Sequence, residues 1–588
     1  MNDQRCIVKC AGICLGGRAG MILLVMFGML AMSVACHESR PSGPVADAPA
    51  PSRPSLPRPN SPETSGGQEQ SEKVDAIEGS QIELIRRADG PRLHWRVGNR
   101  ELISSAGPAL YTRSACDVQV QMERIEEGVL LHYTIANPTG SPQHTPDLVI
   151  GGIAMPRDTV EIVENARHVH LREPTEARDR NILHAMRSYP AESYSPVLGL
   201  RDSDVFLGSS VIYDVFATKL EVQMDYRWDR RAEHWSMVFQ LWDERPDRSG
   251  DRPRAPSAAQ LQPGEEITLT VSVAAVEPDS WVHAYRSYRD AFVQRFGTVR
   301  YERSGEPIKA ISLGTVAQVS AENPRGYNRR GFAGHGRMDQ VGWAGLRQRA
   351  EQDFFPSGFR RVMFWQVSGV YRRPDSQNMV WEITSAWPEA MNRTVDEFRE
   401  TIEAGLEVGL WWGRASQVSF EFDSGPREAW DPDDPAHNEA AFLELDRAYE
   451  LGVRLIGKDA IQRSIAQDDG ERPTSDVLFN QIMPMLHERY PEMFWIIEPA
   501  ACDYLHLWGG TFIWSRDVRG PNEFIEYLIP GSETFAVFRP RREHRDLEGE
   551  NAHMNQELVD QYMRYGYTPI IFSPSLHGLR INRELVPE

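Results

Sequence analysis

Two apolar segments in the C-terminal half of the chain each end in a carboxylate. The first is Val453–Asp459, in which Asp459 directly follows Lys458, and the second is Thr511–Asp517. An ammonium group beside a carboxylate favours the ionised form, which is the state that a nucleophile requires. Cleavage of a glycosidic bond uses two carboxyl groups, one at the anomeric carbon and one that protonates the leaving oxygen. The sequence therefore predicts Asp459 as a nucleophile and Asp517 as an acid/base.

Both aspartates also have a purely structural interpretation. Asp459 could cap the N-terminus of a helix beside a surface lysine. Asp517 could form a salt bridge with Arg516 or Arg519, which would lower its pKa and make it a poor acid. The place of Asp459 at the end of an apolar strand favours catalysis, whereas the two interpretations of Asp517 are equally supported.

Tryptophans gather at the ends of the same kind of apolar segment. The segment Glu407–Trp412 ends in Trp411 and Trp412, and Trp365 and Trp514 occupy comparable positions. Indole faces pack well on the apolar faces of sugar rings, although an aromatic residue in a strand is more often part of the core. Adjacent residues on a strand point to opposite faces, so at most one of Trp411 and Trp412 is expected to reach a pocket.

After Lys309 the chain alternates apolar strands, polar loops and amphipathic helices to its end, which is typical of a parallel α/β sheet. Eight such units in this span predict a closed (β/α)8 barrel, with chemistry at the C-terminal ends of the strands. An open doubly wound sheet is the alternative, and it is disfavoured because no glycine-rich phosphate loop follows a strand. The eight expected strands are Ile311–Val319, Arg361–Val367, Glu407–Trp412, Val453–Asp459, Phe494–Glu498, Thr511–Trp514, Thr534–Phe538 and Thr568–Phe572.

The preceding region has a different rhythm. Short alternating runs such as Val129–Ile135 and Ile267–Val273 are separated by Gly, Pro, Asn and Asp, which predicts many strands and a β-sandwich. Aromatic residues at helical spacing follow from Trp281. The chain of 588 residues is longer than one hydrophobic core usually supports, so several domains are expected. The expected organisation is a β-sandwich over residues 77–280, a linking helix over 281–305 and a catalytic (β/α)8 TIM barrel over 306–588.

The N-terminus has the features of an export signal. Positive residues precede the apolar stretch Met21–Ala35, which is too short for a comfortable membrane span and ends in small residues before Cys36. This ending resembles the bacterial lipoprotein signal, in which the cysteine is lipidated; a plain secretory signal or an uncleaved anchor is the alternative. Residues 1–36 are therefore the expected leader, and residues 37–76, rich in proline and serine, the expected disordered linker. We expect a protein of the cell envelope, held to the membrane only by this anchor.

The formal net charge of −20 disfavours nucleic acid and anionic lipid as partners. Four of the six cysteines lie in the leader, which leaves Cys116 and Cys502 in the folded part. This number is too small for a disulfide framework, and no zinc-binding spacing is present. We therefore expect no metal or other cofactor.

Three motifs together resemble the α-galactosidase (melibiase) and raffinose-synthase clan of retaining glycosidases. They are Ala404–Trp412 on the third strand, Lys458-Asp459 on the fourth and Ile513–Asp517 on the sixth, within the order sandwich, linking helix, barrel. The resemblance implies that Asp459 is the nucleophile, that Asp517 is the acid/base and that Lys458 contacts a sugar hydroxyl. Tyr490–Glu498 is also similar to the clan's fifth strand, where an acidic residue precedes a loop containing Cys and Gly.

The chain departs from the clan at several places. Phe364–Gly369 stands where the α-galactosidases have Asp-Asp-Gly-Trp, Gly413-Arg414 replaces an acidic residue, and Pro499–Asp503 replaces a Ser-Gly-Gly-Gly-Arg loop. These departures weaken any implication of galactose specificity. The expected substrate-binding residues are Lys458, Trp411, Trp412, Trp365, Trp514, Glu498, Asp503 and Arg516.

These features predict an exported glycoside hydrolase that cleaves oligo- or polysaccharides by double displacement, as a retaining α-glycosidase does. The alternative is a protein that has lost catalysis and either binds carbohydrate or serves as a structural envelope lipoprotein.

Overall fold

The computed structural model describes most of the chain after residue 78, and these residues belong to one compact unit. The described residues are 79–165, 169–173, 188–190, 193–244, 258–312, 338–365, 395–412, 417–418, 428–458, 461, 472–498, 502–515, 518–538, 556–572, 576 and 578–586. The expected leader, including Cys36, and the expected linker lie outside them. Within the described ranges, no helix has the length and apolar character needed to cross a membrane.

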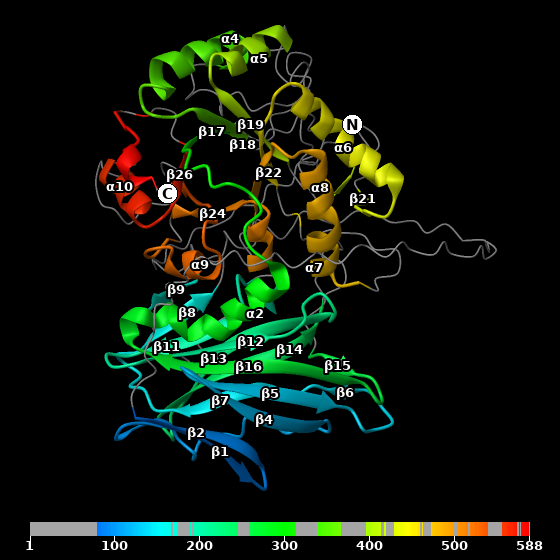
Figure 1. The fold of residues 1–588 in the computed structure, drawn as a ribbon, viewed down its shortest axis with the longest axis vertical. Coiled ribbons are helices and arrows are strands. Elements are labelled where there is room, and N and C mark those ends of the chain that lie inside the picture. Colours follow the sequence, from blue (N-terminus) through cyan, green and yellow to red (C-terminus); the bar gives the residue numbers. More distant parts are fainter. Residues whose placement is uncertain are drawn as a thin grey trace, which may run out of the picture. The chain divides into compact units, whose positions relative to one another are not determined.

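The first part of the described chain forms two seven-stranded antiparallel sheets, drawn from blue to green in Figure 1. The first sheet has the order β1 (Ser80–Arg87), β2 (Gly90–Val97), β3 (Arg100–Ile103), β7 (Leu148–Ile153), β14 (His234–Asp243), β13 (Leu220–Asp229) and β10 (Ser188–Tyr189). The second has the order β4 (Asp117–Ile125), β5 (Gly128–Ala136), β16 (Glu266–Val276), β12 (Phe206–Ile212), β11 (Val197–Arg201), β8 (Glu161–Asn165) and β9 (Val169–Arg172). A separate pair joins β6 (Gln143–His144) and β15 (Gln260–Leu261).

Side-chain alternation explains why these segments are strands. On β5, Val129, Leu131, Tyr133 and Ile135 are all buried in one hydrophobic core, and their neighbours in the sequence point to the other face. The predicted strands at Val129–Ile135 and Ile267–Val273 lie within β5 and β16, which pair with each other.

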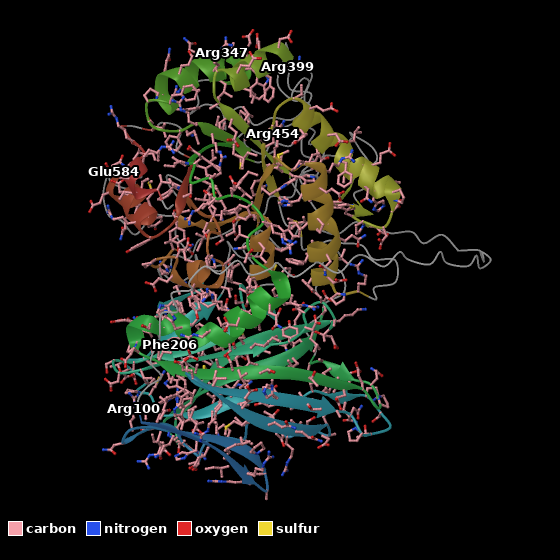
Figure 2. The ribbon with its side chains drawn as sticks, viewed as in Figure 1. Arg100, Phe206, Arg347, Arg399, Arg454 and Glu584 are labelled. Carbon is pink, nitrogen blue, oxygen red and sulfur yellow. The ribbon has the colours of Figure 1, made fainter. Side chains whose placement is uncertain are left out.

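A helical segment occurs where the linking helix over 281–305 was predicted, but it begins at Pro278 and ends at Phe296, and it consists of two consecutive elements. A 3-10 helix, η2 (Pro278–Tyr285), leads directly into α2 (Arg286–Phe296). Tyr288, Phe292 and Phe296 are the buried side chains of α2, at the helical spacing from which the helix was predicted. Phe206 of β12, labelled in Figure 2, packs against Tyr285 with ring centroids 5.9 Å apart, which attaches the helical segment to the second sheet.

The remaining strands form a closed parallel barrel, which confirms the predicted eight-stranded architecture. The last strand pairs with the first through Ile308 and Ile570, so the open doubly wound alternative does not apply. In order around the barrel the strands are β17 (Ile308–Ser312), β18 (Arg361–Trp365), β19 (Glu407–Trp412), β22 (Leu455–Lys458), β23 (Phe494–Ile497), β24 (Gly510–Trp514), β25 (Thr534–Phe538) and β26 (Thr568–Ile571).

Helices lie around these strands in Figure 1. They are α4 (Met338–Arg349) with η4 (Ala350–Phe354), α5 (Val395–Glu403), α6 (Pro435–Glu450), the continuous run α7 (Thr474–Val477), η5 (Leu478–Ile482) and α8 (Met483–Arg489), η6 (Asp503–Leu507), α9 (Glu523–Leu528), α10 (Gln556–Arg564) and η8 (Arg583–Leu585). A two-stranded ribbon joins β20 (Gln417–Val418) to β21 (Glu428–Ala429). Surface ion pairs connect neighbouring helices, as between Arg347 of α4, labelled in Figure 2, and Glu400 of α5.

Each barrel strand alternates between an inner and an outer face. One hydrophobic cluster draws side chains from all eight strands, so it fills the interior of the barrel; its members include Met363, Trp411 and Leu455. The alternate residues, such as Leu410 and Ile456, belong to the larger core that also contains helical residues. The face to which a residue points therefore follows from its position in the strand.

The strand boundaries differ from the prediction mainly at the first strand. It begins at Ile308, three residues before the predicted start, and residues 313–319 of the prediction lie outside the described residues. The sequence did not predict this start because the charged residue Lys309 interrupts the apolar pattern. β19 and β25 have the predicted bounds.

Gly457 tests the packing of the barrel interior. A Cβ atom at this position would lie 2.1 Å from Cε3 of Trp411, so the inner face of β22 must be empty there for the indole to fit. We expect Gly457→Ala to lower the free energy of unfolding by about 1–3 kcal/mol, with part of the loss recovered when Trp411→Phe is added. Urea unfolding followed by circular dichroism measures both.

The matched control is Gly140→Ala, because nothing lies within 4 Å of a Cβ atom there. This control should stay within about 0.5 kcal/mol of the wild type. A Gly457→Ala protein as stable as the control would contradict the packing of Trp411 inside the barrel.

Candidate active site

The two predicted catalytic residues follow strands that end on the same edge of the barrel. Asp459 comes directly after β22, and Asp517 comes three residues after the end of β24. Both strands run parallel, and β23 alone separates them in the barrel. Asp459, Arg516 and Asp517 themselves lie outside the described residues.

The tryptophans divide between the two faces of the barrel, as their positions in the strands predict. Trp411 and Trp514 lie inside, where each packs against Phe512, with ring centroids 5.9 and 5.6 Å apart. Trp412 points outward and packs against Trp430, with centroids 5.8 Å apart. Trp412 therefore belongs to the core outside the barrel, and this position contradicts its predicted contact with a sugar.

The inner tryptophans are buried. Trp411 is 2% exposed and Trp514 is 9% exposed, so they fill the interior below the ends of β19 and β24. Trp365 is the last residue of β18, on the same edge of the barrel. Aromatic side chains thus fill the barrel interior next to the strand ends at which a barrel of this kind carries its active site.

Lys458 does not lie on the inner face, in contrast to the sugar contact implied by the resemblance. Its ammonium group lies 3.2 Å from Sδ of Met483 and 4.1 Å from the ring centre of Trp495, and the residue is fully buried outside the barrel. Burial holds the pKa of this amine well below its usual value. The reason is the alternation of the strand, because its neighbour Gly457 occupies the inner face.

Glu498 is a described carboxylate at the C-terminal edge of the barrel. It follows β23 directly, is partly exposed, and its backbone N–H donates to the carbonyl oxygen of Lys458 at 2.9 Å. This bond places the backbone of Glu498 beside the end of β22. Glu498 therefore lies at the C-terminal edge of the barrel, and its predicted contact with substrate stays a prediction.

Asp503 lies away from any open surface, which corrects its predicted role as a sugar ligand. Its side chain is fully buried and accepts two hydrogen bonds on each carboxylate oxygen. Tyr189 Oη and the backbone N–H of Tyr504 donate to Oδ1, both at 2.9 Å, and Tyr288 Oη and Ser195 Oγ donate to Oδ2, both at 2.6 Å. All the lone pairs of an ionised carboxylate are thereby used.

Burial raises the pKa of Asp503 to about 6, because an ionised group loses its hydration, and the four donors oppose that rise. His506, one helical turn later, is also buried, and burial lowers its pKa to about 3. Its Nδ1 lies 3.0 Å from Tyr194 Oη. Near neutral pH, Asp503 is therefore mostly ionised and His506 is neutral.

The sequence did not single out the residues that bind Asp503. Tyr189 and Ser195 lie more than 300 positions earlier in the chain, so no local pattern connects them with it. Tyr288 lies among the aromatic residues at helical spacing after Trp281, and its ring is buried in the structure. A tyrosine at a buried helical position was the available signal, because its hydroxyl needs a polar partner.

No His, Cys, Asp and Glu cluster suited to a metal ion occurs in the part of the chain that the structure describes. At the C-terminal edge of the barrel, the structure describes the carboxylate Glu498 and the ends of β22 and β24, which lead in the sequence to Asp459 and Asp517.

No model of a known protein family and no curated protein matches the sequence. Solved structures do match the fold. The α-N-acetylgalactosaminidase NagBb from Bifidobacterium bifidum, in complex with GalNAc, has a TM-score of 0.50 at 9% identity, over 85% of this chain and 88% of that chain. A β-arabinopyranosidase has a TM-score of 0.45 at 10% identity, over 87% and 85% of the two chains. The galactosidase domain of the α-galactosidase-sucrose kinase AgaSK has a TM-score of 0.42 at 12% identity, over 87% and 68%. All three are named as enzymes that act on glycosides. The likeness to NagBb shows that this chain has a similar fold to that protein.

Proposed function

We propose that the protein is a glycoside hydrolase that acts on oligo- or polysaccharides, as a divergent relative of the α-galactosidase-like clan. One observation carries this proposal: β22 and β24, which lead to Asp459 and Asp517, end on the same edge of a closed parallel barrel with one strand between them. Carboxylates that follow nearby parallel strands are well placed to act on one substrate. The shared fold with NagBb supports the same reaction class.

The alternation of β22 favours Asp459 over Lys458 as the reacting group. Leu455 belongs to the inner cluster and Gly457 faces the inner indole, so every second residue of this strand points inward. An extended backbone that continued by one step would put residue 459 on the same side. This expectation separates the aspartate from the lysine that precedes it.

The proposed reaction is a double displacement. The Asp459 carboxylate attacks the anomeric carbon and forms a glycosyl ester, while Asp517 gives its proton to the leaving oxygen. Asp517 then takes a proton from a water molecule, whose oxygen attacks the anomeric carbon and releases Asp459. The chain needs no cofactor for these steps. Glu498 and the residues after Trp365 and Trp514 would orient the sugar.

We propose further that the two antiparallel sheets pack as a β-sandwich over residues 77–280, joined by residues 281–305 to a catalytic barrel over 306–588. Core residues of both sheets, such as Ile150 and Val271, belong to one hydrophobic cluster, which supports this arrangement. Residues 1–36 would direct export, and residues 37–76 would act as a spacer from the membrane.

A second function is favoured by one observation. Three residues that were expected to bind the sugar are buried away from the barrel interior: Lys458, Trp412 and Asp503. A barrel that has lost part of the clan's sugar-binding set would suit a carbohydrate-binding protein or a structural envelope lipoprotein without catalysis. Binding on a glycan array without hydrolysis would favour a carbohydrate-binding protein. The absence of both binding and hydrolysis would favour a structural lipoprotein.

The catalytic assignment predicts large losses of turnover. Asp459→Asn and Asp517→Ala should each lower kcat on aryl α-glycosides by about a thousandfold or more, because each removes a group that makes a bond or transfers a proton in the reaction. Release of the aryl alcohol measures the rate, and circular dichroism checks that each variant is folded. Asp396→Asn on the surface of α5, where the side chain is 82% exposed, is the control and should match the wild type. A wild-type rate in Asp459→Asn would remove the mechanism.

The export assignment predicts lipidation of Cys36. In a bacterial host that is fed an alkyne analogue of palmitate, the wild-type protein should carry the label and fractionate with membranes. Cys36→Ser should lose both the label and the membrane association, because one thiol accepts the lipid. An unlabelled wild-type protein would overturn lipidation and leave a plain secretory signal or an uncleaved anchor.

A further inference from the structure

Buried polar contacts, alongside aromatic ones, join the antiparallel region to the barrel. The backbone N–H groups of Cys502 and Asp503 donate to the carbonyl oxygens of Ser193 and Tyr194, at 3.2 and 2.9 Å. Tyr194 also lies within hydrogen-bond distance of His506. The segment from Ser193 to Ser195, before β11, is thus joined to the segment Cys502–His506 by backbone and side-chain bonds together.

Other contacts lie at the neighbouring barrel units. Glu244, at the end of β14, accepts a hydrogen bond of 3.0 Å from the backbone N–H of Thr474, the first residue of α7. Trp281 of η2 donates to Glu523, the first residue of α9, at 2.8 Å. Thr474 follows β22, Cys502 follows β23 and Glu523 follows β24. These contacts therefore reach the segments that follow the three strands on which the proposed active site depends.

Asp503 is the centre of these contacts. Its four donors come from β10, from the segment before β11, from α2 and from the backbone N–H of the next residue, Tyr504. A buried carboxylate is stable only when its oxygens are well supplied with donors. Displacement of any one of the three elements would leave this group unsatisfied. The arrangement therefore favours one position of the segment that follows β23.

We infer that Asp503 is a positioning residue for the substrate site, because its buried carboxylate fixes the segment Cys502–Leu507 against the antiparallel sheets and α2. Through this segment the antiparallel region determines the position of the chain between Glu498 and β24, at the edge of the barrel. The inference rests on the proposed function for the identity of the substrate, whereas the positioning role itself is argued from the contacts of Asp503. It assigns to the sheets and α2 a part in substrate binding through Tyr189, Ser195 and Tyr288.

The backbone before Asp503 supports this role. Cys502 has a φ of 62°, in the left-handed region that residues other than glycine rarely adopt. Such a conformation persists where the surrounding structure determines it, and such sites are often functional. The two backbone bonds to Ser193 and Tyr194, with the carboxylate contacts, supply that constraint. The raised pKa of Asp503 is the expected consequence of placing an ionisable group at this buried junction.

The test uses the full-length protein and variants that remove one side of the junction at a time. Asp503→Asn keeps the size of the side chain but places an NH2 group, itself a donor, opposite hydrogen-bond donors that now point at a carboxylate oxygen. Tyr288→Phe and Ser195→Ala each remove one donor to Oδ2 and should fold even if Asp503→Asn does not. The matched control is Tyr133→Phe, which removes a buried hydroxyl that donates to the carbonyl oxygen of Leu110, within the antiparallel region.

Two readouts separate positioning from general stability. Hydrogen exchange followed by mass spectrometry should show faster exchange in peptides covering residues 188–195 and 494–514, with the other barrel peptides unchanged. On aryl glycosides, KM should rise roughly tenfold, as expected for the loss of a buried charge-assisted contact, and kcat should change much less. Tyr133→Phe should leave both the KM and the exchange of residues 494–514 at the wild-type values.

Exchange that rises over the whole barrel, or nowhere, would overturn the inference. So would local exchange with an unchanged KM in all three variants, because the junction would then be structural alone. A wild-type protein that hydrolyses no glycoside would refute the proposed function instead. In that case the exchange result, together with the binding of free galactose and N-acetylgalactosamine by calorimetry, decides whether the junction positions a sugar site.

Discussion

Closure of the parallel barrel is the constraint on which the rest of the structure depends. Once eight strands form a ring, each residue on a strand points either to an interior that is already full or to a layer shared with the helices. The interior is filled by side chains such as Trp411, Phe512 and Trp514, and β22 makes room for them with Gly457. Polar chemistry is therefore left to the ends of the strands and the loops that follow them.

The same constraint separates residues that are adjacent in the sequence. Gly457 and Lys458 lie on opposite faces of β22, as do Trp411 and Trp412 on β19. Lys458 is then enclosed by Met483 and Trp495, where its amine has an aromatic ring and a thioether as close neighbours. Such a site favours the uncharged amine, which would not provide the ionic contact to a substrate that an exposed lysine can provide.

A second constraint acts where the antiparallel region meets the barrel. Polar groups that lose their hydration must find partners within the protein, and here a carboxylate, four hydroxyl groups and a histidine meet. Directional bonds of this kind allow fewer arrangements than apolar packing does. The neighbouring aromatic contacts, including Phe296 with Tyr504 at 5.7 Å between ring centroids, supply the apolar burial around them.

Much of the fold could be predicted because strand and helix periodicity are local. The bounds of β19 and β25, a helix after Trp281 and the number of barrel strands follow from patterns of a few residues. The junction around Asp503 could not be predicted, because its partners are brought together only by the tertiary fold. Lys458 is a different case. Its outward direction follows from the same alternation that separated Trp411 from Trp412, but the family pattern led to the opposite assignment.

The central claim is that Asp459 attacks the sugar at the open edge of this barrel. The most direct measurement uses an activated 2-deoxy-2-fluoroglycoside, which a retaining enzyme converts into a long-lived glycosyl ester. Peptide mapping by mass spectrometry should find one sugar per chain, on the peptide that contains Asp459. A sugar attached to a different carboxylate, or turnover of ordinary glycosides without any trapped ester, would contradict the account.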